Sequence, residues 1–384
     1  MNSEASSASF VTILSPYIFH QEFFTKSRIK ISSKYPNVYE TYDLPGMLMK
    51  KVIQRHGLWF RVSLPHIIQE GIGDAYIPFS KAITYISNQS IVLITMKNVV
   101  GCSDGSIYFK GSYFIPNDKC HPKYWNWNYQ LIPNLSIDCK VFKSVIHVGH
   151  QHAADFGHWF LEVFPALMMF PRTILYESNI FIPKREHFII ECLQTIGFNL
   201  NNVIYGEYTY FYAINYYTAY YSNCGDLNQA LLHRLRKHFV KKYSLDTCQP
   251  SRFLIYNRVN MSREITNFPD FFEALRKIYP NITWEVLNKT MTIEESARLM
   301  NEVKLVFAIH GSFLCNALFM QKRTVVIELQ MEQWLLSFVW LSYYTEKYSV
   351  IGRDSRISWH RKQINNLNLT YVMKMFEYAF QKIS

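Results

Sequence analysis

The sequence lacks the features that define several protein classes. It has seven cysteines but no Cys-x-x-Cys pair, which excludes a zinc ribbon or a thioredoxin-type redox motif, and the odd number leaves at least one thiol free in a monomer. No apolar stretch reaches the roughly 18 residues of a membrane-spanning helix. The N-terminus has no basic flank and no long apolar run, so no signal peptide is expected. Internal repeats and low-complexity segments are absent as well.

Charge is scarce but has one dominant sign. Only 18% of the residues are charged, while 49% are hydrophobic and 16% aromatic, so we expect a globular chain with ample core. The net charge of +11 favours an anionic partner. The densest basic runs, at 26–30 and 234–238, are shorter than a nucleic-acid-binding arm, so no nucleic acid is expected. A solvated basic surface is the simpler alternative.

At 384 residues the chain is longer than the chains that usually fold around a single hydrophobic core, so two domains are expected. The expected parts are an irregular segment (1–40), an N-terminal domain (41–246), a C-terminal domain (247–358) and a final amphipathic helix (359–384). The N-terminal domain begins β-like, with a hairpin signal at Asp104-Gly105, and then alternates strands with helices. From RFLIYNR onward, four strands alternate with three helices, which predicts an α/β fold with a doubly wound parallel sheet.

Two segments of the C-terminal half favour an anion site. An apolar strand breaks at His310-Gly311-Ser312 before a helix; Gly311 permits close backbone approach, and Ser312 is expected to cap the helix and donate to an oxyanion. Arg258 and Arg263 follow another strand, where their guanidinium groups match phosphate geometry. Each feature alone also fits a plain turn or a solvated loop, but ligands bind at the carboxyl edge of such sheets.

Glu328 ends the strand TVVIELQ on the same expected edge. It would accept hydrogen bonds from ribose hydroxyls or, equally, serve as a satisfied capping residue.

The segment HVGHQHAADFGHW (147–159) holds His147, His150, His152 and His158. Four imidazoles this close indicate a metal site, and a metal-dependent hydrolase is one alternative function. However, no HExxH-like motif is present, and strand alternation sends neighbouring side chains to opposite faces, which argues against metal binding.

The chain resembles glycosyltransferase family 61, which includes plant xylosyl- and arabinosyltransferases and animal O-linked N-acetylglucosaminyltransferases. The resemblance rests on FGHWFLEVFP, on NR…SREITN and on TIEESARLMNEVKLVFAIHGSFLCNALFM…VVIEL, in the family's order and spacing. Two departures stand out: His310-Gly311-Ser312 replaces the usual HGA, and Asp155 stands where asparagine is frequent.

The resemblance implies a GT-B architecture, two Rossmann-like domains facing across a cleft, with the final helix crossing back to the first domain. It implies an inverting enzyme that transfers xylose, arabinose or N-acetylglucosamine from a UDP-sugar to a glycan or glycoprotein acceptor. No metal and no further cofactor is expected, and the sequence has no Asp-x-Asp triplet to clamp a metal on UDP. The implied donor-binding residues are Asn257, Arg258, Arg263, His310, Gly311, Ser312, Phe313, Asn316 and Glu328.

An inverting transferase needs one general base for the acceptor hydroxyl. His158 and Glu162 stand four residues apart in a predicted helix, so they share one face, and either is a candidate. Burial would raise the pKa of Glu162 toward a useful value, whereas His158 titrates near neutrality without help. Asp155 is a third catalytic candidate, although it is expected mainly to cap the helix.

Two questions stay open at this stage. A non-catalytic basic module that binds glycans or nucleic acid is the second alternative function. The lack of a visible signal or anchor predicts a soluble, cytoplasmic protein, whereas the resemblance implies the Golgi or ER lumen. Donor sugar, acceptor, disulfide state and oligomeric state are not encoded in any local motif.

Overall fold

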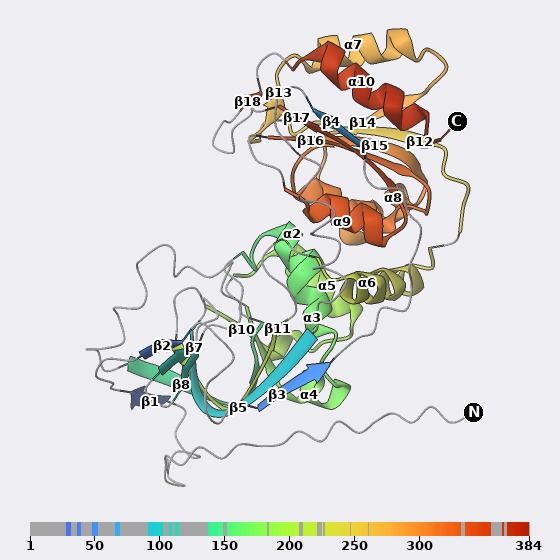
Figure 1. The fold of residues 1–384 in the computed structure, drawn as a ribbon. Coiled ribbons are helices and arrows are strands. Elements are labelled where there is room, and N and C mark those ends of the chain that lie inside the picture. The colour runs from blue at the N-terminus through green and yellow to red at the C-terminus, as the bar shows by residue number, and fades with distance from the viewer. Residues whose placement is uncertain are drawn as a thin grey trace. The chain divides into compact units, whose positions relative to one another are not determined.

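The computed structural model divides the chain into two compact α/β units, each described by itself (Figure 1). Unit 1 comprises Met1–Gln54 and Gln89–Cys224, and unit 2 comprises Arg55–Asn88 and Gly225–Ser384. The described residues are 28–31, 37–39, 48–52, 66–69, 91–102, 107–109, 112–114, 137–148, 152–182, 184–206, 210–220, 225, 227–245, 247–259, 261–331, 335–354, 363–364 and 367–383.

Unit 2 contains a parallel sheet with the strand order β14-β12-β15-β16-β17-β4. Its strands are β12 (Arg252–Tyr256), β14 (Trp284–Leu287), β15 (Val303–Ile309), β16 (Val325–Gln330), β17 (Tyr348–Arg353) and β4 (His66–Gln69). Taken in chain order from β12, the sequence of strands is 2-1-3-4-5, which is a doubly wound order. The predicted doubly wound parallel sheet is therefore confirmed. The edge strand β4 comes from the N-terminal half of the sequence.

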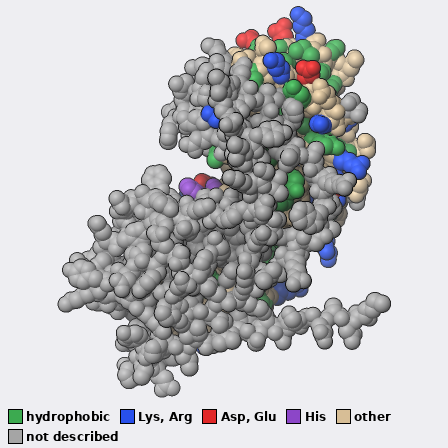
Figure 2. Space-filling model, viewed as in Figure 1, with side chains coloured by type: hydrophobic (Ala, Val, Ile, Leu, Met, Phe, Trp, Pro, Cys, Tyr) green, Lys and Arg blue, Asp and Glu red, His purple; other side chains and the backbone are tan. Residues whose placement is uncertain are grey.

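Helices cover both faces of this sheet. Figure 1 shows α7 and α10 on one face and α8 and α9 on the other. The helical elements are α6 (Gln229–Lys242), α7 (Phe268–Ile278), α8 (Ile293–Asn301), the 3₁₀ helix η5 (Ser312–Phe319), α9 (Ser337–Tyr344) and α10 (Leu369–Phe380); a short pair, β13 (Glu264–Ile265) and β18 (Gln363–Ile364), lies beside them. Over α7 and α10, charged side chains of both signs lie on the outer surface (Figure 2).

Side-chain caps explain where several of these helices begin. Thr292 and Glu295 form a reciprocal capping box at the start of α8, with the Thr292 hydroxyl accepting from the Glu295 backbone N–H. The Asn228 side chain accepts from two backbone N–H groups of α6, and Asn368 accepts from one in α10. These polar residues precede amphipathic segments, so the sequence alone marks the helix starts.

Helix α10 packs on β16, β17 and α7 within unit 2. Its buried face includes Met375 and Phe376, which join the core cluster of that unit. Gly352 of β17 makes this approach possible, because a Cβ there would lie 2.8 Å from Met375 Cε and would overlap its Sδ. The expected return of this helix to the first domain stays a prediction.

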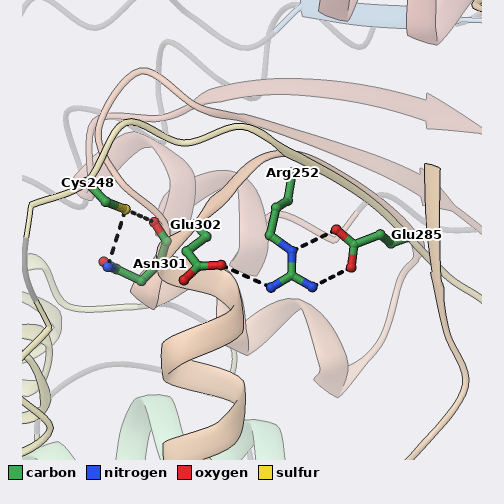
Figure 3. Close-up of polar contacts among 5 residues, drawn as sticks. All are labelled: Cys248, Arg252, Glu285, Asn301 and Glu302. Atoms are coloured by element: carbon green, nitrogen blue, oxygen red, sulfur yellow. Dashed lines mark hydrogen bonds and ion pairs between the residues drawn. The ribbon is translucent and has the colours of Figure 1, made fainter. Parts of the chain in front are cut away.

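An ion-pair cluster ties β12 to its neighbours (Figure 3). Arg252 of β12 donates through Nε and Nη2 to both carboxylate oxygens of Glu285 in β14, and through Nη1 to Glu302 Oε2 at 3.0 Å. Nearby, the Cys248 thiol donates to the Asn301 carbonyl at 3.1 Å. The bidentate geometry fixes the side chains across adjacent strands.

Unit 1 contains a mixed sheet with the order β10-β9-β8-β11-β5-β6-β7-β2, with β1 beside β8 and β3 beside β5. Its strands are β1 (Arg28–Ile31), β2 (Asn37–Tyr39), β3 (Leu48–Val52), β5 (Ile91–Cys102), β6 (Ile107–Phe109), β7 (Ser112–Phe114), β8 (Ile137–Ile146), β9 (Asn179–Ile182), β10 (Val203–Tyr205) and β11 (Tyr210–Tyr220). Strands β8, β9, β10 and β11 run parallel where they pair, whereas β5 and β6 form the predicted antiparallel hairpin.

The helical elements of unit 1 are α2 (Phe156–His158), the π-helical turn η3 (Trp159–Val163), α3 (Phe164–Leu167), α4 (Arg172–Glu177), α5 (His187–Thr195) and the 3₁₀ turn η4 (Leu200–Asn202). Pro165 occupies the first turn of α3. Proline cannot donate a backbone hydrogen bond, and the first turn of a helix is where that missing donor costs least. The π-helical turn immediately before it widens the helix over Trp159–Val163.

The compact units divide differently from the expected domains. Helix α6 belongs to unit 2, so the change falls between Cys224 and Gly225, and β4 adds residues from Arg55–Asn88 to the same unit. The boundaries of independent domains at 246 and 358 stay predictions. Within the part of the chain that the structure describes, no helix is both long and apolar enough to cross a membrane.

Candidate active-site residues

The sheet of unit 2 has a topological switch point between β12 and β15. These strands are hydrogen-bonded neighbours, and their following connections lead to β14 and β16 on opposite sides. In doubly wound sheets the crevice at the carboxyl ends of such strands binds ligands. The two loops predicted to bind an anion, 257–263 and 310–312, follow these two strands.

The structure brings both arginines to Gly311. A Cβ built on Gly311 would lie 2.6 Å from Arg258 Nη1 and 3.6 Å from Arg263 Nη1. Arg263 has a left-handed backbone, with φ of 71°, and its Nη1 donates to the His310 carbonyl at 2.7 Å. The predicted grouping of Arg258, Arg263 and Gly311 on one sheet edge is thereby observed.

The environment of Arg258 is unusual for a cation. Its Nε and Nη1 atoms are buried, and among the described residues neither has a hydrogen-bond partner. Burial lowers the pKa of the Arg258 guanidinium, and burial together with the charge of Arg258 lowers the pKa of Arg263 to about 10. Buried charged groups normally have partners, so a pair of adjacent guanidiniums favours the binding of an anion.

His310 and Glu328 form a buried pair beside the arginines. His310 Nδ1 lies 2.5 Å from Glu328 Oε1, and the two residues are 7% and 0% exposed. The His310 ring also packs against Phe338. Glu328, expected at the end of its strand, lies within β16 (Val325–Gln330). Its Oε1 is engaged with His310, while Oε2 is buried without a partner among the described residues.

The helix after Gly311 differs from the prediction. It is the 3₁₀ helix η5, and its N-cap is Gly311, so Ser312 does not occupy the predicted capping position. Phe313 stacks on Tyr256 with ring centroids 3.9 Å apart. Asn316 is buried, and its Oδ1 has no partner among the described residues. A 3₁₀ helix aligns its N–H groups less well than an α-helix does. An anion bound here would therefore be held mainly by the side chains of the two arginines.

Asn257, predicted to bind the donor, makes a hydrogen bond within its own loop, and donor binding by this residue stays a prediction. Its Oδ1 accepts from the Ile265 backbone N–H at 3.1 Å, and the residue is 5% exposed. This bond closes the loop that carries both arginines. Asn257 therefore positions Arg258 and Arg263.

The described histidines of the segment 147–159 make contacts with aromatic rings, a tyrosine hydroxyl and carboxylates. His147 is buried, with its Nδ1 3.2 Å from the Tyr216 hydroxyl and its ring against Phe181 and Phe211. His150 lies outside the described residues. Among the residues that the structure describes, no group of three or more His, Cys, Asp or Glu side chains is placed to hold a metal ion.

His158 and Glu162 form the pair that their spacing predicts. His158 Nδ1 lies 2.7 Å from Glu162 Oε1; the two side chains are 30% and 4% exposed. Burial lowers the pKa of His158, but the hydrogen bond to Glu162 and the charges of Glu162 and Asp155 outweigh it, so the pKa lies above 6.5. The imidazole is accessible, whereas the carboxylate is enclosed.

A second histidine–carboxylate pair lies beside the first. His152 Nδ1 is 3.2 Å from Asp155 Oδ2, and the rings of His152 and His158 stack with centroids 5.0 Å apart. Asp155 stands at the N-cap of α2, as predicted, but its side chain makes no capping hydrogen bond. Its carboxylate instead contacts His152 Nδ1, and its charge contributes to raising the pKa of His158.

Sequence reasoning missed three contributors: Tyr256, Phe338 and the stacking of His152. Tyr256 directly precedes the Asn257-Arg258 pair, so its place at a strand end was a usable signal. The helix with Phe338 had no such signal, because tertiary packing alone brings it to His310.

Residues 156–327 match the family model of glycosyltransferase 61. This range includes His158, Glu162, both arginines and the His310-Gly311-Ser312 turn, while Asp155 and Glu328 lie one residue outside it. No curated protein matches the chain. The two parallel-rich sheets agree with the α/β fold expected for this resemblance. The chain therefore carries a glycosyltransferase 61 domain and is a glycosyltransferase.

Proposed function

We propose that the protein is an inverting transferase that moves a sugar from a UDP-sugar to a hydroxyl of a glycan or glycoprotein acceptor. One observation carries this proposal: the Arg258 guanidinium lies against Gly311 at the switch point of unit 2, with two buried donor atoms that have no partner among the described residues. A diphosphate is the ligand whose charge and geometry satisfy such a group.

In this proposal, Arg258 and Arg263 bind the donor diphosphate and stabilise the charge that develops as it leaves. The site needs no divalent cation, since guanidinium groups supply the positive charge. The Glu328 Oε1 atom is engaged by His310 Nδ1, so the carboxylate is held by the histidine beside the proposed diphosphate site. The stacked rings of Tyr256 and Phe313, both half-buried, offer an aromatic surface for the uracil ring of the donor.

His158 is the general base of this proposal, and Glu162 orients it. The difference in exposure supports the assignment, because the acceptor hydroxyl can reach a 30% exposed imidazole more readily than a 4% exposed carboxylate. Since Nδ1 donates to Glu162, Nε2 carries the lone pair that takes the proton. The GT-B architecture belongs to the same proposal: unit 2 binds the donor and unit 1 supplies the base.

A screen of donor hydrolysis tests the proposed function. Purified protein is incubated with UDP-linked xylose, arabinose and N-acetylglucosamine, and with GDP-linked sugars as controls, in the presence of a chelator. We expect release of UDP from one UDP-sugar, with inversion at the anomeric carbon seen by NMR, and loss of that activity in Arg258→Ala. Turnover that requires a divalent ion, or turnover of GDP-sugars alone, would contradict the proposal.

A further inference from the structure

Unit 2 contains a basic pocket at the end of η5 opposite Gly311. The pocket has a volume of about 340 Å³ and is lined by His233, Arg236, Lys237, Val240, Lys322, Thr345 and Glu346. Arg236 donates to the carbonyls of Leu318 and Met320, at the C-terminal end of η5. At a rise of about 2 Å per residue, the eight residues of η5 separate this pocket from Gly311 by roughly 16 Å.

The charges around this pocket are unbalanced. Arg236, Lys237 and Lys322 are positive, and Glu346 is the one acidic residue of the lining. Glu346 is already engaged by Lys322, with Nζ and Oε1 2.5 Å apart. Lys237 is exposed and makes no ion pair with any described residue. Within the pocket lining, three cationic side chains therefore face a single carboxylate.

A buried lysine, Lys347, directly follows the lining residues Thr345 and Glu346 in the chain. Lys347 is 1% exposed, and its ammonium nitrogen donates to the carbonyl of Thr345 at 3.2 Å. No carboxylate forms an ion pair with it among the described residues. Burial and then the charge of Arg236 lower the pKa of Lys347 well below its ordinary value. A buried lysine next to unbalanced cations is costly unless a negative group offsets it.

The backbone at the pocket is held in an uncommon conformation. Glu346 and Arg323 both have left-handed backbones, with φ of 59° and 60°, and the Arg323 N–H donates to the Glu346 carbonyl at 2.8 Å. Non-glycine residues rarely adopt this conformation, and such residues cluster at binding sites. The turn presents Glu346 and Lys322 to the same space as helix α6.

We propose that this pocket is a second binding site, for a tetrahedral oxyanion carried as phosphate or sulfate. Arg236 and Lys237 come from α6, whereas Lys322 comes from the turn after η5, so cations approach from different directions. A tetrahedral anion presents oxygens in several directions, which suits this arrangement better than a planar carboxylate. The site is independent of the donor site, and it stands whether or not the donor is a UDP-sugar.

Calorimetric titration of the full chain with inorganic phosphate tests the site, at constant ionic strength maintained with chloride. The measurement is made in an Arg258→Ala background, which removes binding at the switch point. We expect saturable binding in that background, at least tenfold weaker when Lys237→Glu is added. Lys241→Glu, an exposed reversal on the same helix outside the pocket lining, should change the affinity less than threefold.

Three results would overturn the proposal: no saturable binding, complete loss of binding in Arg258→Ala alone, or equal effects of the two lysine variants. Parallel titrations with glucose 6-phosphate and glucose 6-sulfate identify the source of the anion. Tighter binding of an ester than of inorganic phosphate assigns the site to a modified sugar, and the reverse order assigns it to the free anion. Circular dichroism of each variant checks that the fold is retained.

Discussion

The guanidinium of Arg258 lies so close to Gly311 that a Cβ on the glycine would approach Arg258 Nη1 to 2.6 Å. This contact joins the loop after β12 to the loop after β15, at the switch point of the sheet. The glycine is required here for space and not for its backbone, because its φ of 164° is an extended value that other residues adopt.

Gly311→Ala should therefore weaken donor binding with little effect on folding. The methyl group would displace the end of the flexible Arg258 side chain, which can move without disturbing the backbone. We expect UDP affinity to fall about 10-fold, since a charge-assisted hydrogen bond contributes about 1.5–3 kcal/mol. Thermal unfolding with and without UDP measures both effects. A large loss of stability without UDP, or an unchanged UDP shift, would count against the assigned role of the contact.

His158→Ala should lower kcat by about 10²–10⁴-fold, the usual contribution of a general base. UDP affinity should change little, because donor binding is assigned to the other unit. Steady-state kinetics and UDP titration of the same variant separate the two effects. An equal loss of UDP affinity and of kcat would instead assign His158 to donor binding.

Glu162→Gln tests the pairing through the pH profile. The base must be neutral, so the rate rises as pH increases through the pKa of His158. In the wild type this pKa is raised above 6.5, because the effects of Glu162 and Asp155 outweigh burial. Removing the Glu162 charge should move the acidic limb of kcat/KM to lower pH. A limb that stays in place would show that another group controls it.

Arg252→Met should destabilise unit 2 by about 1 kcal/mol at neutral pH, a modest value because the side chains of Arg252 and Glu285 are each 34% exposed. Hydrogen bonding to Arg252 lowers the pKa of Glu285. A lowered pKa contributes stability above the unfolded-state value and loses it as pH falls through the folded-state value. The difference between wild type and variant, measured by urea denaturation, should thus shrink as pH falls through the lowered pKa of Glu285.

Arg298→Met is a matched control for that experiment. Arg298 pairs with Glu294 within a single exposed helix turn, so its loss should cost less than about 0.5 kcal/mol. Equal effects of the two variants at neutral pH would show that the bond between strands adds nothing.

Gly352→Ala tests the packing of α10 on β17. The new methyl group would overlap Met375, which is fully buried, so we expect a loss of about 1–3 kcal/mol. In a Met375→Ala background the same substitution should cost much less, because the obstructing side chain is gone. Equal costs in both backgrounds would place the strain elsewhere.

Much of the C-terminal architecture could be predicted because its signals are local. The spacing of Thr292 and Glu295 is that of a capping box at the start of α8, and apolar runs mark β15 and β16. The loops that contain Arg258 and Gly311 directly follow strands. The spacing of His158 and Glu162 also predicts their contact, which survives the π-helical turn. Such features can be read from short spacings in the sequence: alternation every two residues in strands, and a repeat of three to four residues in helices.

The missing parts depend on long-range packing. Strand β4 pairs with β17 across most of the chain length, and nothing in HIIQ specifies that partner. The segment SFLCNALF is apolar except for Ser312 and Asn316, and two polar residues are too few to distinguish an α-helix from the 3₁₀ helix that forms. The hydrogen bond from the Ile265 N–H to Asn257, which closes the arginine loop, has no sequence signal either.

Titration calorimetry of UDP in the presence of a chelator tests the central claim most directly. The account predicts saturable binding to the wild-type protein without divalent ions. In Arg258→Ala the affinity should fall about 10- to 100-fold, because a hydrogen bond to a charged group contributes about 1.5–3 kcal/mol. Absence of binding at millimolar UDP, or equal affinity of the two proteins, would contradict it.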